Sequence, residues 1–368
     1  MRINAVELKN FRNYSQQKVK FDPLCNVIYG ENAQGKTNLL EAILYLSSAS
    51  SPRCRSDKEI LRFEAKDAML SGNIYSHERD MNIRMEWMAG QRRKIWINQV
   101  LLRKTTEMMG LLQTVYFCPE DLYIIRSGPA ERRRFMEDSL CQLRPRYAEA
   151  LSEYKRLYEH KTRILRDGPE KPDLLKTLPE FNERMILAGA VLIHYRAQFA
   201  ARLSEYAAAA HKECSGGKES LSVRYETVSN VTDTFAQLQQ IQQQLRVHQE
   251  QHYAAEIASR LCLSGPHKDD LDILIDGISA RSFASQGQVR TAALSLKLAQ
   301  REIHKNAAGE YPLLLLDDVL SELDQRRQEF VLNQIQEGQV FITCCEDDRL
   351  GSLLRGKVFH VTNGKIQD

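Results

Sequence analysis

The sequence predicts an α/β fold in which the two ends of the chain form one lobe and a mainly helical arm is inserted between them. Near the N-terminus, an apolar strand at 24–29 leads through a glycine-containing loop into a helical stripe at 37–47. Between about 115 and 255, apolar residues recur at helical spacing over long stretches. After about 270, apolar strands alternate with helices again, which is typical of a parallel sheet.

The composition is that of an ordinary globular protein. Of 368 residues, 43% are hydrophobic, and 51 basic side chains nearly balance 48 acidic ones, for a net charge of +3. These values exclude a disordered chain and a polybasic nucleic-acid binder. No apolar run reaches the roughly 18 residues of a membrane span, the N-terminus lacks an apolar signal segment, and the eight cysteines are scattered. We therefore expect a cytoplasmic protein with reduced thiols and no membrane partner.

The expected elements follow one another in a clear order. Short strands around a turn at 10–14 open the chain, and a hairpin with Gly90 at its turn is expected at 82–102. Helices are expected at 131–140, 146–165, 179–214 and 234–260, the last with a short coiled-coil seam. Strands at 272–276, 313–316 and 340–343 then alternate with helices at 288–305 and 325–336. We assign 1–114 and 256–368 to one discontinuous lobe, and 115–255 to the helical arm.

The segment GENAQGKT, from Gly30 to Thr37, fits the phosphate-binding pattern G-x-x-x-x-G-K-[ST] in full. Gly30 and Gly35 let the backbone turn so that successive N–H groups face a phosphate, and the start of the following helix adds partial positive charge. Lys36 is expected to reach the β- and γ-phosphates of ATP, and Thr37 to ligate Mg²⁺. A chance glycine-rich turn is the alternative, but the preceding strand and following apolar helix favour a nucleotide site.

Two acids, Asp317 and Asp318, end the strand expected at 313–316. A carboxylate at this end of a strand holds Mg²⁺ beside a phosphate-binding loop, so Asp317 is the second candidate Mg²⁺ ligand. Asp318 would then act as general base on the attacking water. Taken alone, the pair is equally compatible with a solvated turn after the strand.

Ser285-Gln286-Gly287-Gln288 opens the helix expected at 288–305. Ser285 and Gln288 fit a capping box, in which side chains and backbone at a helix start satisfy one another. The same segment could present the Ser285 hydroxyl and the Gly287 N–H to an anion. Its place between a phosphate loop and Asp317 matches the signature motif of ABC-type ATPases, where the signature of one subunit closes over the nucleotide held by the other.

Four blocks in this order resemble the RecF family, bacterial recombination and gap-repair ATPases related to SMC head domains. The blocks are the phosphate loop as far as Ile43, GPHKDD at Gly265–Asp270, SQGQVRT at Ser285–Thr291, and LLDDVLSELD at Leu315–Asp324. The similarity extends along nearly the whole chain, from LKNFRNY at Leu8–Tyr14 to the last strands. The resemblance implies an ABC/SMC-type P-loop ATPase head with an inserted helical arm.

The resemblance also implies roles for individual residues. Asp317 corresponds to the Walker B acid, and Asp318 stands where related ATPases usually place a catalytic Glu. Ser321–Asp324 corresponds to the D-loop, and Pro119–Asp121 to the Q-loop region. With the loop itself, the implied nucleotide-binding residues are Arg12, Gly30, Asn32, Gly35, Lys36, Thr37, Asn38, Ser285, Gly287 and Gln288.

One feature departs from the pattern of ABC ATPases, which often carry a switch His after the strand that follows Walker B. Here, Phe341-Ile342-Thr343 is followed by Cys344-Cys345-Glu346-Asp347. A His sensor of the γ-phosphate is therefore not expected at this place. Slow hydrolysis is expected, because the carboxylate of Asp318 reaches less far than that of a Glu.

Clusters of arginine are the candidate DNA surface. Arg132, Arg133 and Arg134 start one helix, and Arg92 and Arg93 lie near the Gly90 turn, with Arg53, Arg55 and Lys94 as similar candidates. Such side chains bind phosphates without reading sequence, so binding should be salt-dependent. The alternative is a solvated basic face with one arginine paired to an acid such as Glu137. His248, His252 and Glu256 have the spacing of a zinc site, but a Gln-rich polar face of the helix is the favoured alternative.

The expected mechanism is a switch. Two ATP molecules, each held by Lys36 of one copy and Ser285 of the other, would close a homodimer around duplex or junction DNA, and hydrolysis would reopen it. By resemblance, the partners are RecR and RecO, RecA loading is the purpose, and the place is the bacterial nucleoid. Two alternatives stay open: the ATPase subunit of a membrane transporter, and a binding module that holds ATP without hydrolysing it.

Overall fold

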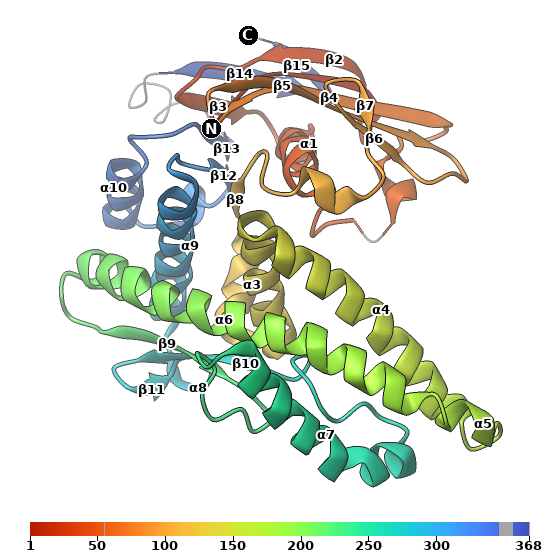
Figure 1. Ribbon diagram of the computed structural model, residues 1–368. Coiled ribbons are helices and arrows are strands. Elements are labelled where there is room, and N and C mark those ends of the chain that lie inside the picture. Colours follow the sequence, from red (N-terminus) through yellow and green to blue (C-terminus); the bar gives the residue numbers. More distant parts are fainter. Residues whose placement is uncertain (55, 346–355, 368) are drawn as a thin grey trace. The chain divides into compact units, whose positions relative to one another are not determined.

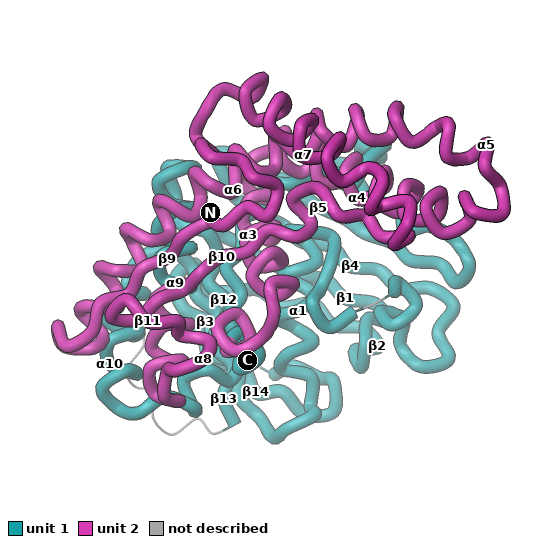
Figure 2. The backbone as a smooth tube through the Cα atoms, turned by 90° about the horizontal axis from the view of Figure 1, so that it is seen from below, with its two compact units in different colours: residues 1–121, 297–368 teal, residues 122–296 magenta. Residues whose placement is uncertain are grey.

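The computed structural model describes residues 1–54, 56–345 and 356–367. The chain divides into two compact units, which Figure 2 colours separately. Unit 1 contains Met1–Asp121 and Lys297–Asp368, and unit 2 contains Leu122–Leu296. No described helix is both long enough and apolar enough to cross a membrane.

The first sheet of unit 1 is antiparallel and has the strand order β2-β1-β4-β5-β6-β7. Its strands are β1 (Arg2–Phe11), β2 (Tyr14–Lys20), β4 (Asp67–Ser76), β5 (Arg79–Met88), β6 (Lys94–Ile97) and β7 (Val100–Leu101). Buried and exposed residues alternate along β4 and β5, as in a sheet with one face on a core. The expected hairpin is confirmed, because β5 pairs with β6 through a turn in which Gly90 has a φ of +77°.

The second sheet of unit 1 carries the chemistry. Its order is β15-β14-β3-β13-β12-β8, in which only β15 is antiparallel. The strands are β3 (Cys25–Tyr29), β8 (Thr114–Phe117), β12 (Leu313–Asp317), β13 (Val340–Cys344), β14 (Lys357–Thr362) and β15 (Lys365–Gln367). Because parallel strands end at the same edge, the loops after β3, β12 and β13 meet there.

Helix α1 (Lys36–Ser48) contacts strands of both sheets of unit 1. Its Leu39, Leu40 and Ile43 are buried in one core with Trp87 of the first sheet and Phe341 of the second. Unit 1 also contains α10 (Gln325–Gln334) and the last turns of α9 (Gln286–Ala308). The core therefore fixes the start of α1 against the edge where the parallel strands end (Figure 1).

Unit 2 is mainly helical, with one small sheet of order β11-β10-β9. Its helices are α2 (Tyr123–Arg126), α3 (Pro129–Leu143), α4 (Pro145–Asp167), α5 (Pro172–Leu175), α6 (Leu178–Ser215), α7 (Leu238–Ser259) and α8 (Ala280–Phe283), with the first turns of α9. Its strands are β9 (Leu221–Glu226), β10 (Asp270–Ile275) and β11 (Ile278–Ser279). The expected seam of α7 exists, since Ile241 and Leu245 pack on Ile186, Ala190 and Ile193 of α6.

The unit boundaries differ from the expected domain boundaries. Residues 115–121 belong to unit 1, because β8 pairs with β12. Residues 256–296 belong to unit 2, because β10 pairs with β9, a strand that the sequence did not predict. Each shift has the same cause, since a strand belongs with the partner to which it is hydrogen-bonded rather than with its neighbours along the chain.

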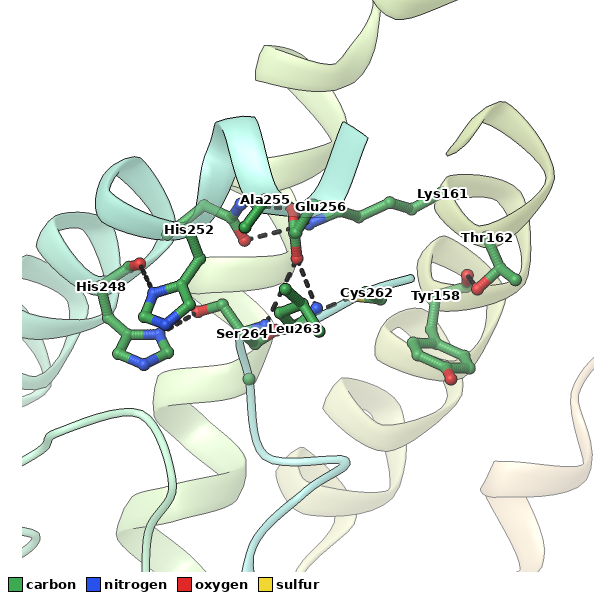
Figure 3. Close-up of polar contacts among 12 residues, drawn as sticks. Tyr158, Lys161, Thr162, His248, His252, Ala255, Glu256, Cys262, Leu263 and Ser264 are labelled. Carbon is green, nitrogen blue, oxygen red and sulfur yellow. Dashed lines mark hydrogen bonds and ion pairs between the residues drawn. The ribbon is translucent and has the colours of Figure 1, made fainter. Parts of the chain in front are cut away.

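A buried polar cluster joins α4 and α7 inside unit 2 (Figure 3). Lys161 and Glu256 form an ion pair of 2.7 Å, and both side chains are at most 1% exposed. Gln249 bonds to both, and the Glu256 carboxylate also accepts the Leu263 N–H at 2.7 Å. The polar face that the sequence predicted is buried at Glu256 and His248, and His248 stacks on His252. Among the described residues, no group of His, Cys, Asp and Glu has the arrangement of a metal site.

Candidate nucleotide-binding site

The phosphate loop connects β3 to α1, as the sequence predicted. Gly30 has a φ of +146° and Gly35 a φ of +123°, a region that favours glycine. Neighbouring backbone and side chains leave no room for a larger residue. A Cβ on Gly30 would lie 2.4 Å from the Val361 carbonyl oxygen, and one on Gly35 would lie 2.6 Å from Asn13 Nδ2.

Lys36 is the first residue of α1 and is only 4% exposed. Its Nζ donates to the carbonyl oxygens of Gly30 at 2.6 Å and Glu31 at 3.1 Å, and contacts Cys345 Sγ at 3.8 Å. No described carboxylate forms an ion pair with it. A buried ammonium without a counter-ion, curled inside its own loop, is suited to an anionic ligand.

The two candidate Mg²⁺ ligands lie together, although 280 residues separate them. Thr37 Oγ1 donates to Asp317 Oδ1 at 3.0 Å. Thr343 Oγ1 donates to the same oxygen at 2.8 Å, and the Tyr116 hydroxyl donates to Asp317 Oδ2 at 2.7 Å. A carboxylate beside a threonine hydroxyl is the hard oxygen donor set that Mg²⁺ prefers, so these residues fit the ion.

Asp318 has a left-handed backbone, with a φ of +53°. Its Oδ1 is buried and has no hydrogen-bond partner among the described residues. Burial raises the pKa of this carboxyl; the Lys36 ammonium opposes the rise and the Asp317 carboxylate adds to it. An unpartnered carboxylate oxygen with a raised pKa is a competent proton acceptor.

The turn between β1 and β2 braces the phosphate loop from outside. Asn13 Nδ2 donates to the Gln34 carbonyl at 2.7 Å, Asn38 Nδ2 donates to Asn13 Oδ1 at 2.8 Å, and the Tyr14 hydroxyl donates to the Gly35 carbonyl at 2.9 Å. Sequence reasoning missed Asn13 and Tyr14, although both lie in the turn it predicted. Their place in the segment LKNFRNY, which resembles the family, was the signal that could have found them.

The remaining expected nucleotide contacts of unit 1 have protein partners here. Arg12 forms a bidentate pair with Glu41 of α1, with both distances 2.8 Å, and donates to the Glu59 carbonyl at 2.7 Å. Asn32 is exposed, and its Oδ1 accepts from Cys345 Sγ at 3.2 Å. Arg12 therefore orients α1, whereas Asn32 lies at the mouth of the loop.

The strand β13 ends beside the acid pair. Thr343 Oγ1 accepts the Asp318 N–H at 2.8 Å while it donates to Asp317, so this threonine clamps both acids. The exposed Cys345 follows at the place where ABC ATPases often carry a switch His. Glu346 and Asp347 lie outside the described residues.

The segment Pro119–Asp121, which the resemblance assigns to the Q-loop region, contacts other parts of the protein through Asp121. Asp121 Oδ2 accepts the Cys118 N–H at 2.9 Å, and Asp121 Oδ1 pairs with Lys297 of α9 at 2.7 Å. Lys297 also donates to the Tyr116 carbonyl at 2.9 Å. Asp121 therefore anchors its loop to α9.

In unit 2, the signature segment builds the capping box that the sequence predicted. Ser285 N–H donates to Gln288 Oε1 at 2.8 Å, and Gln288 N–H donates to Ser285 Oγ at 3.2 Å. Gln288 Nε2 also donates to Glu219 at 3.0 Å. Ser285 is exposed, so its hydroxyl proton stays available to a ligand.

The candidate DNA arginines divide into two groups. Arg132 is 4% exposed, pairs with Asp270 rather than Glu137, and donates to two carbonyls, so it is a structural residue and not a DNA contact. Arg133 donates to the Asp269 carbonyl, and Arg93 pairs with Asp57. The exposed candidates are Arg53, Arg92, Lys94 and Arg134, and Arg55 lies outside the described residues.

The block GPHKDD at Gly265–Asp270 is a structural junction of unit 2. The Pro266 carbonyl accepts from the buried Arg196 at 2.7 Å, and His267 bonds to the Tyr154 hydroxyl at 2.8 Å. Asp269 accepts from the Tyr225 hydroxyl and the Val228 N–H, and Asp270 holds Arg132. Its role is to tie β10 to helices α3, α4 and α6.

A phosphate loop, an acid pair at the end of a parallel strand, and a signature segment on a following helix define a P-loop ATPase of the ABC/SMC head class. The family described as RecF/RecN/SMC N terminal domain matches residues 2–365. The chain belongs to the RecF family: proteins named DNA replication and repair protein RecF from Agathobacter rectalis and Lactobacillus johnsonii are each 37% identical, over 100% of this chain and 99% of theirs.

Solved structures agree with this assignment. The structure of the recombination mediator protein RecF with ATP in the RecFOR pathway is 31% identical, covers 99% of this chain and 96% of its own, and has a TM-score of 0.90. An SMC head bound to a domain of ScpA has a TM-score of 0.56 at 18% identity over 100% of this chain and 96% of its own, which shows the shared fold alone. These relatives do not favour the transporter alternative.

Proposed function

We propose that this protein is an ATP-dependent DNA-binding protein of recombinational gap repair and replication-fork maintenance that hydrolyses ATP slowly. The observation that supports it best is the cluster at the edge of the parallel sheet. There, within the described parts of the chain, Lys36 has no carboxylate partner and Asp318 has a buried oxygen without a hydrogen-bond partner, while Thr37 bonds to Asp317. A cation, a metal-type donor pair and a proton acceptor are what phosphoryl transfer from ATP to water requires.

Each residue has a part in this reaction. The N–H groups of the loop 30–37 and the ammonium of Lys36 bind and orient the phosphates. Thr37 and Asp317 would hold Mg²⁺, which neutralises charge on the phosphates. Asp318 accepts a proton from the attacking water. Its short side chain makes hydrolysis slow, and Asp318→Asn should keep ATP binding but lose single-turnover hydrolysis; equal turnover would mean that another group is the base.

We propose that ATP closes a head-to-head homodimer. In this arrangement, the exposed Ser285 and the Gly287 N–H of one copy contact the phosphates held by Lys36 of the other. The capping box supports this role, because it fixes the Ser285 hydroxyl at the start of α9. Ser285→Arg should bind ATP but fail to dimerise, and sedimentation with ATP would measure this. Normal ATP-dependent dimers of that variant would contradict the model.

On unit 1, DNA is proposed to contact the exposed Arg92, with a weaker contribution from Arg93, which already pairs with Asp57. On unit 2, it is proposed to contact the exposed Arg134, with a weaker contribution from Arg133, which already donates to the Asp269 carbonyl. Such contacts neutralise the backbone of duplex and junction DNA without reading bases. Relatives of known structure act in the RecFOR pathway. We therefore propose RecO and RecR as partners, RecA loading as the outcome, and the bacterial nucleoid as the place of action.

The test is binding of a labelled gapped duplex, followed by fluorescence anisotropy with ATP, with ADP and without nucleotide, across a salt series. ATP should tighten binding, and Lys36→Ala should lose the gain. Affinity should fall steeply with salt. If the protein binds no DNA at low salt in any nucleotide state, the proposed function is wrong, and the ATPase head must serve another partner.

A further inference from the structure

The hydroxyl of Tyr116 donates a hydrogen bond to Oδ2 of Asp317, the acid that corresponds to Walker B. No sequence pattern indicated this role for Tyr116. It lies on β8, which pairs in parallel with β12, and its register partner there is Leu315. Its hydroxyl reaches Asp317 Oδ2 at 2.7 Å. The half-buried ring therefore bridges two neighbouring strands at the edge where the candidate metal ligands lie.

The phenol can only donate in this contact. The carboxylate oxygen that it meets has lone pairs and no proton, so the Tyr116 hydroxyl is the donor and Asp317 Oδ2 is the acceptor. Asp317 then accepts one hydrogen bond on Oδ2 from Tyr116, and two on Oδ1 from Thr37 and Thr343. All three donors are neutral, so they orient the carboxylate without cancelling its charge.

The hydroxyls on the two oxygens differ in function. Thr37 is itself a proposed metal ligand, so its bond to Asp317 competes with that role. Tyr116 approaches the other oxygen and has no such competing role. It can therefore fix the rotation of the carboxylate in both the empty and the loaded site.

Tyr116 is also held in place through its backbone. Its carbonyl accepts from Lys297 Nζ at 2.9 Å, and Lys297 pairs with Asp121 at 2.7 Å, five residues further along the chain from Tyr116. Lys297 is 8% exposed and belongs to α9, the helix that begins at the signature segment. The segment 116–121 is thus anchored at two points to one helix.

We propose that Tyr116 is a positioning residue that sets the orientation of Asp317 and thereby the Mg²⁺ dependence of nucleotide binding. The inference rests on the proposed ATPase function, and it concerns a residue outside the motifs of the ATP site. It acts through Asp317 alone and makes no contact with nucleotide.

The test compares Tyr116→Phe with the unmodified chain in calorimetric titrations of ATP with EDTA and with a series of Mg²⁺ concentrations. With EDTA the two affinities should agree. The Mg²⁺ concentration at half-maximal effect should rise about tenfold or more in the variant, because one hydrogen bond to a charged group is lost. Mn²⁺ binds such sites more tightly than Mg²⁺ and should reduce the deficit.

Tyr14→Phe is the matched control. It removes another buried phenol hydroxyl, which donates to the Gly35 carbonyl of the phosphate loop and not to Asp317. It should weaken ATP binding with and without Mg²⁺ by the same factor. A melting curve of each variant without nucleotide confirms folding, and Tyr116→Leu, which suits an apolar parallel strand, replaces the phenylalanine variant if that one is unfolded.

The outcomes separate this inference from the proposed function. If Tyr116→Phe has the Mg²⁺ dependence of the unmodified chain, Tyr116 does not position Asp317, although the ATP site stands. If Tyr116→Phe also weakens binding in EDTA by the factor seen with Mg²⁺, its role is general packing, and the inference is again overturned. If the unmodified chain binds no ATP in any metal, the proposed function itself fails.

Discussion

Each unit of the molecule contains a buried lysine and a buried carboxylate, and the two units differ in whether these opposite charges form an ion pair. In unit 2, Lys161 and Glu256 are paired with each other at 2.7 Å, and amides satisfy their remaining positions. In unit 1, Lys36 and Asp317 are nearly as buried, at 4% and 5% exposure, but they are not paired. Among the residues that the structure describes, Lys36 bonds to carbonyls, and Asp317 accepts from hydroxyls.

The difference teaches how to tell structural from functional buried charges. Burying an ion costs several kcal/mol unless an opposite charge and hydrogen bonds compensate it. The pair in unit 2 is compensated within the protein, so it holds helices α4 and α7 together (Figure 3). The charges of unit 1 are not compensated in this way, so part of the free-energy cost of burying them remains. A bound polyphosphate with its metal ion would supply the missing opposite charges.

Breaking the pair in unit 2 should give the largest loss of stability. Lys161→Met leaves Glu256 charged, buried and without a cation, which should lower the free energy of unfolding by about 3–5 kcal/mol. Urea denaturation measures the change. ATP affinity of the folded variant should equal that of the unmodified chain.

The double variant Lys161→Met/Glu256→Leu is the control for this prediction. It removes both charges and fills the space with apolar groups, so most of the lost stability should return. If the double variant is as unstable as the single one, packing rather than charge explains the loss. If Lys161→Met is as stable as the unmodified chain, the Lys161–Glu256 ion pair does not stabilise unit 2.

The matched change in unit 1 is Asp317→Asn, which keeps the size of the side chain and removes its charge. Single-turnover ATP hydrolysis should fall about a thousandfold, or about 4 kcal/mol, because the metal ion loses its carboxylate ligand. Unfolding in urea without nucleotide should need as much denaturant as before. A variant that hydrolyses ATP within tenfold of the normal rate would remove Asp317 from the metal site.

Lys36→Met tests the other charge of unit 1 and mirrors the substitution at Lys161. ATP affinity should fall about a hundredfold, roughly 3 kcal/mol, because a cation at the phosphates is lost. Without ATP, however, stability should change little, since no buried carboxylate loses its partner. Calorimetry and urea denaturation measure the two quantities. A loss of stability as large as that of Lys161→Met would mean that Lys36 has a hidden structural counter-ion.

The contrast between the units also explains what the sequence could predict. The phosphate loop is contiguous, and its glycines, lysine and threonine follow from local chemistry alone. The sequence also predicted that Thr37 and Asp317 hold one Mg²⁺, and the structure places the two side chains in contact at the edge of the parallel sheet. Helices α1, α6 and α9 were predicted within a few residues, because each carries an apolar stripe over several turns.

Partnerships between distant polar residues could not be predicted. Nothing near Lys161 in the sequence indicates Glu256, and Arg132 looked like part of a basic surface although it pairs with Asp270. Tyr116 was not singled out either, because a tyrosine in a strand is usually a core residue. The strand β9 was also missed, because it is defined by its pairing with the distant strand β10 and not by its own sequence pattern.

A third way to bury a titratable group is to keep it neutral, and His304 of α9 does this. Its side chain is 0% exposed, and Nδ1 lies 2.9 Å from Gln113 Oε1. Burial lowers the pKa of His304 to about 3. In the unfolded chain a histidine titrates near pH 6.5. As the pH falls below that value, the unfolded state takes up a proton that the folded state refuses, so stability is lost.

This gives the smallest of the expected effects. Between pH 6 and pH 4, His304 should cost about 2 kcal/mol of unfolding free energy, which His304→Gln should spare. Chemical denaturation of both chains at the two pH values gives the difference, in which other titrating groups cancel. A difference that does not vary with pH would mean that His304 takes up a proton in the folded state at the same pH as in the unfolded chain, and burial would then not keep it neutral. If the predicted loss appears, three kinds of buried titratable group can be told apart. Lys161 and Glu256 are charged and paired with each other, and His304 is neutral. Lys36 and Asp317 are charged and not paired with each other, and such a pair of charges indicates a ligand.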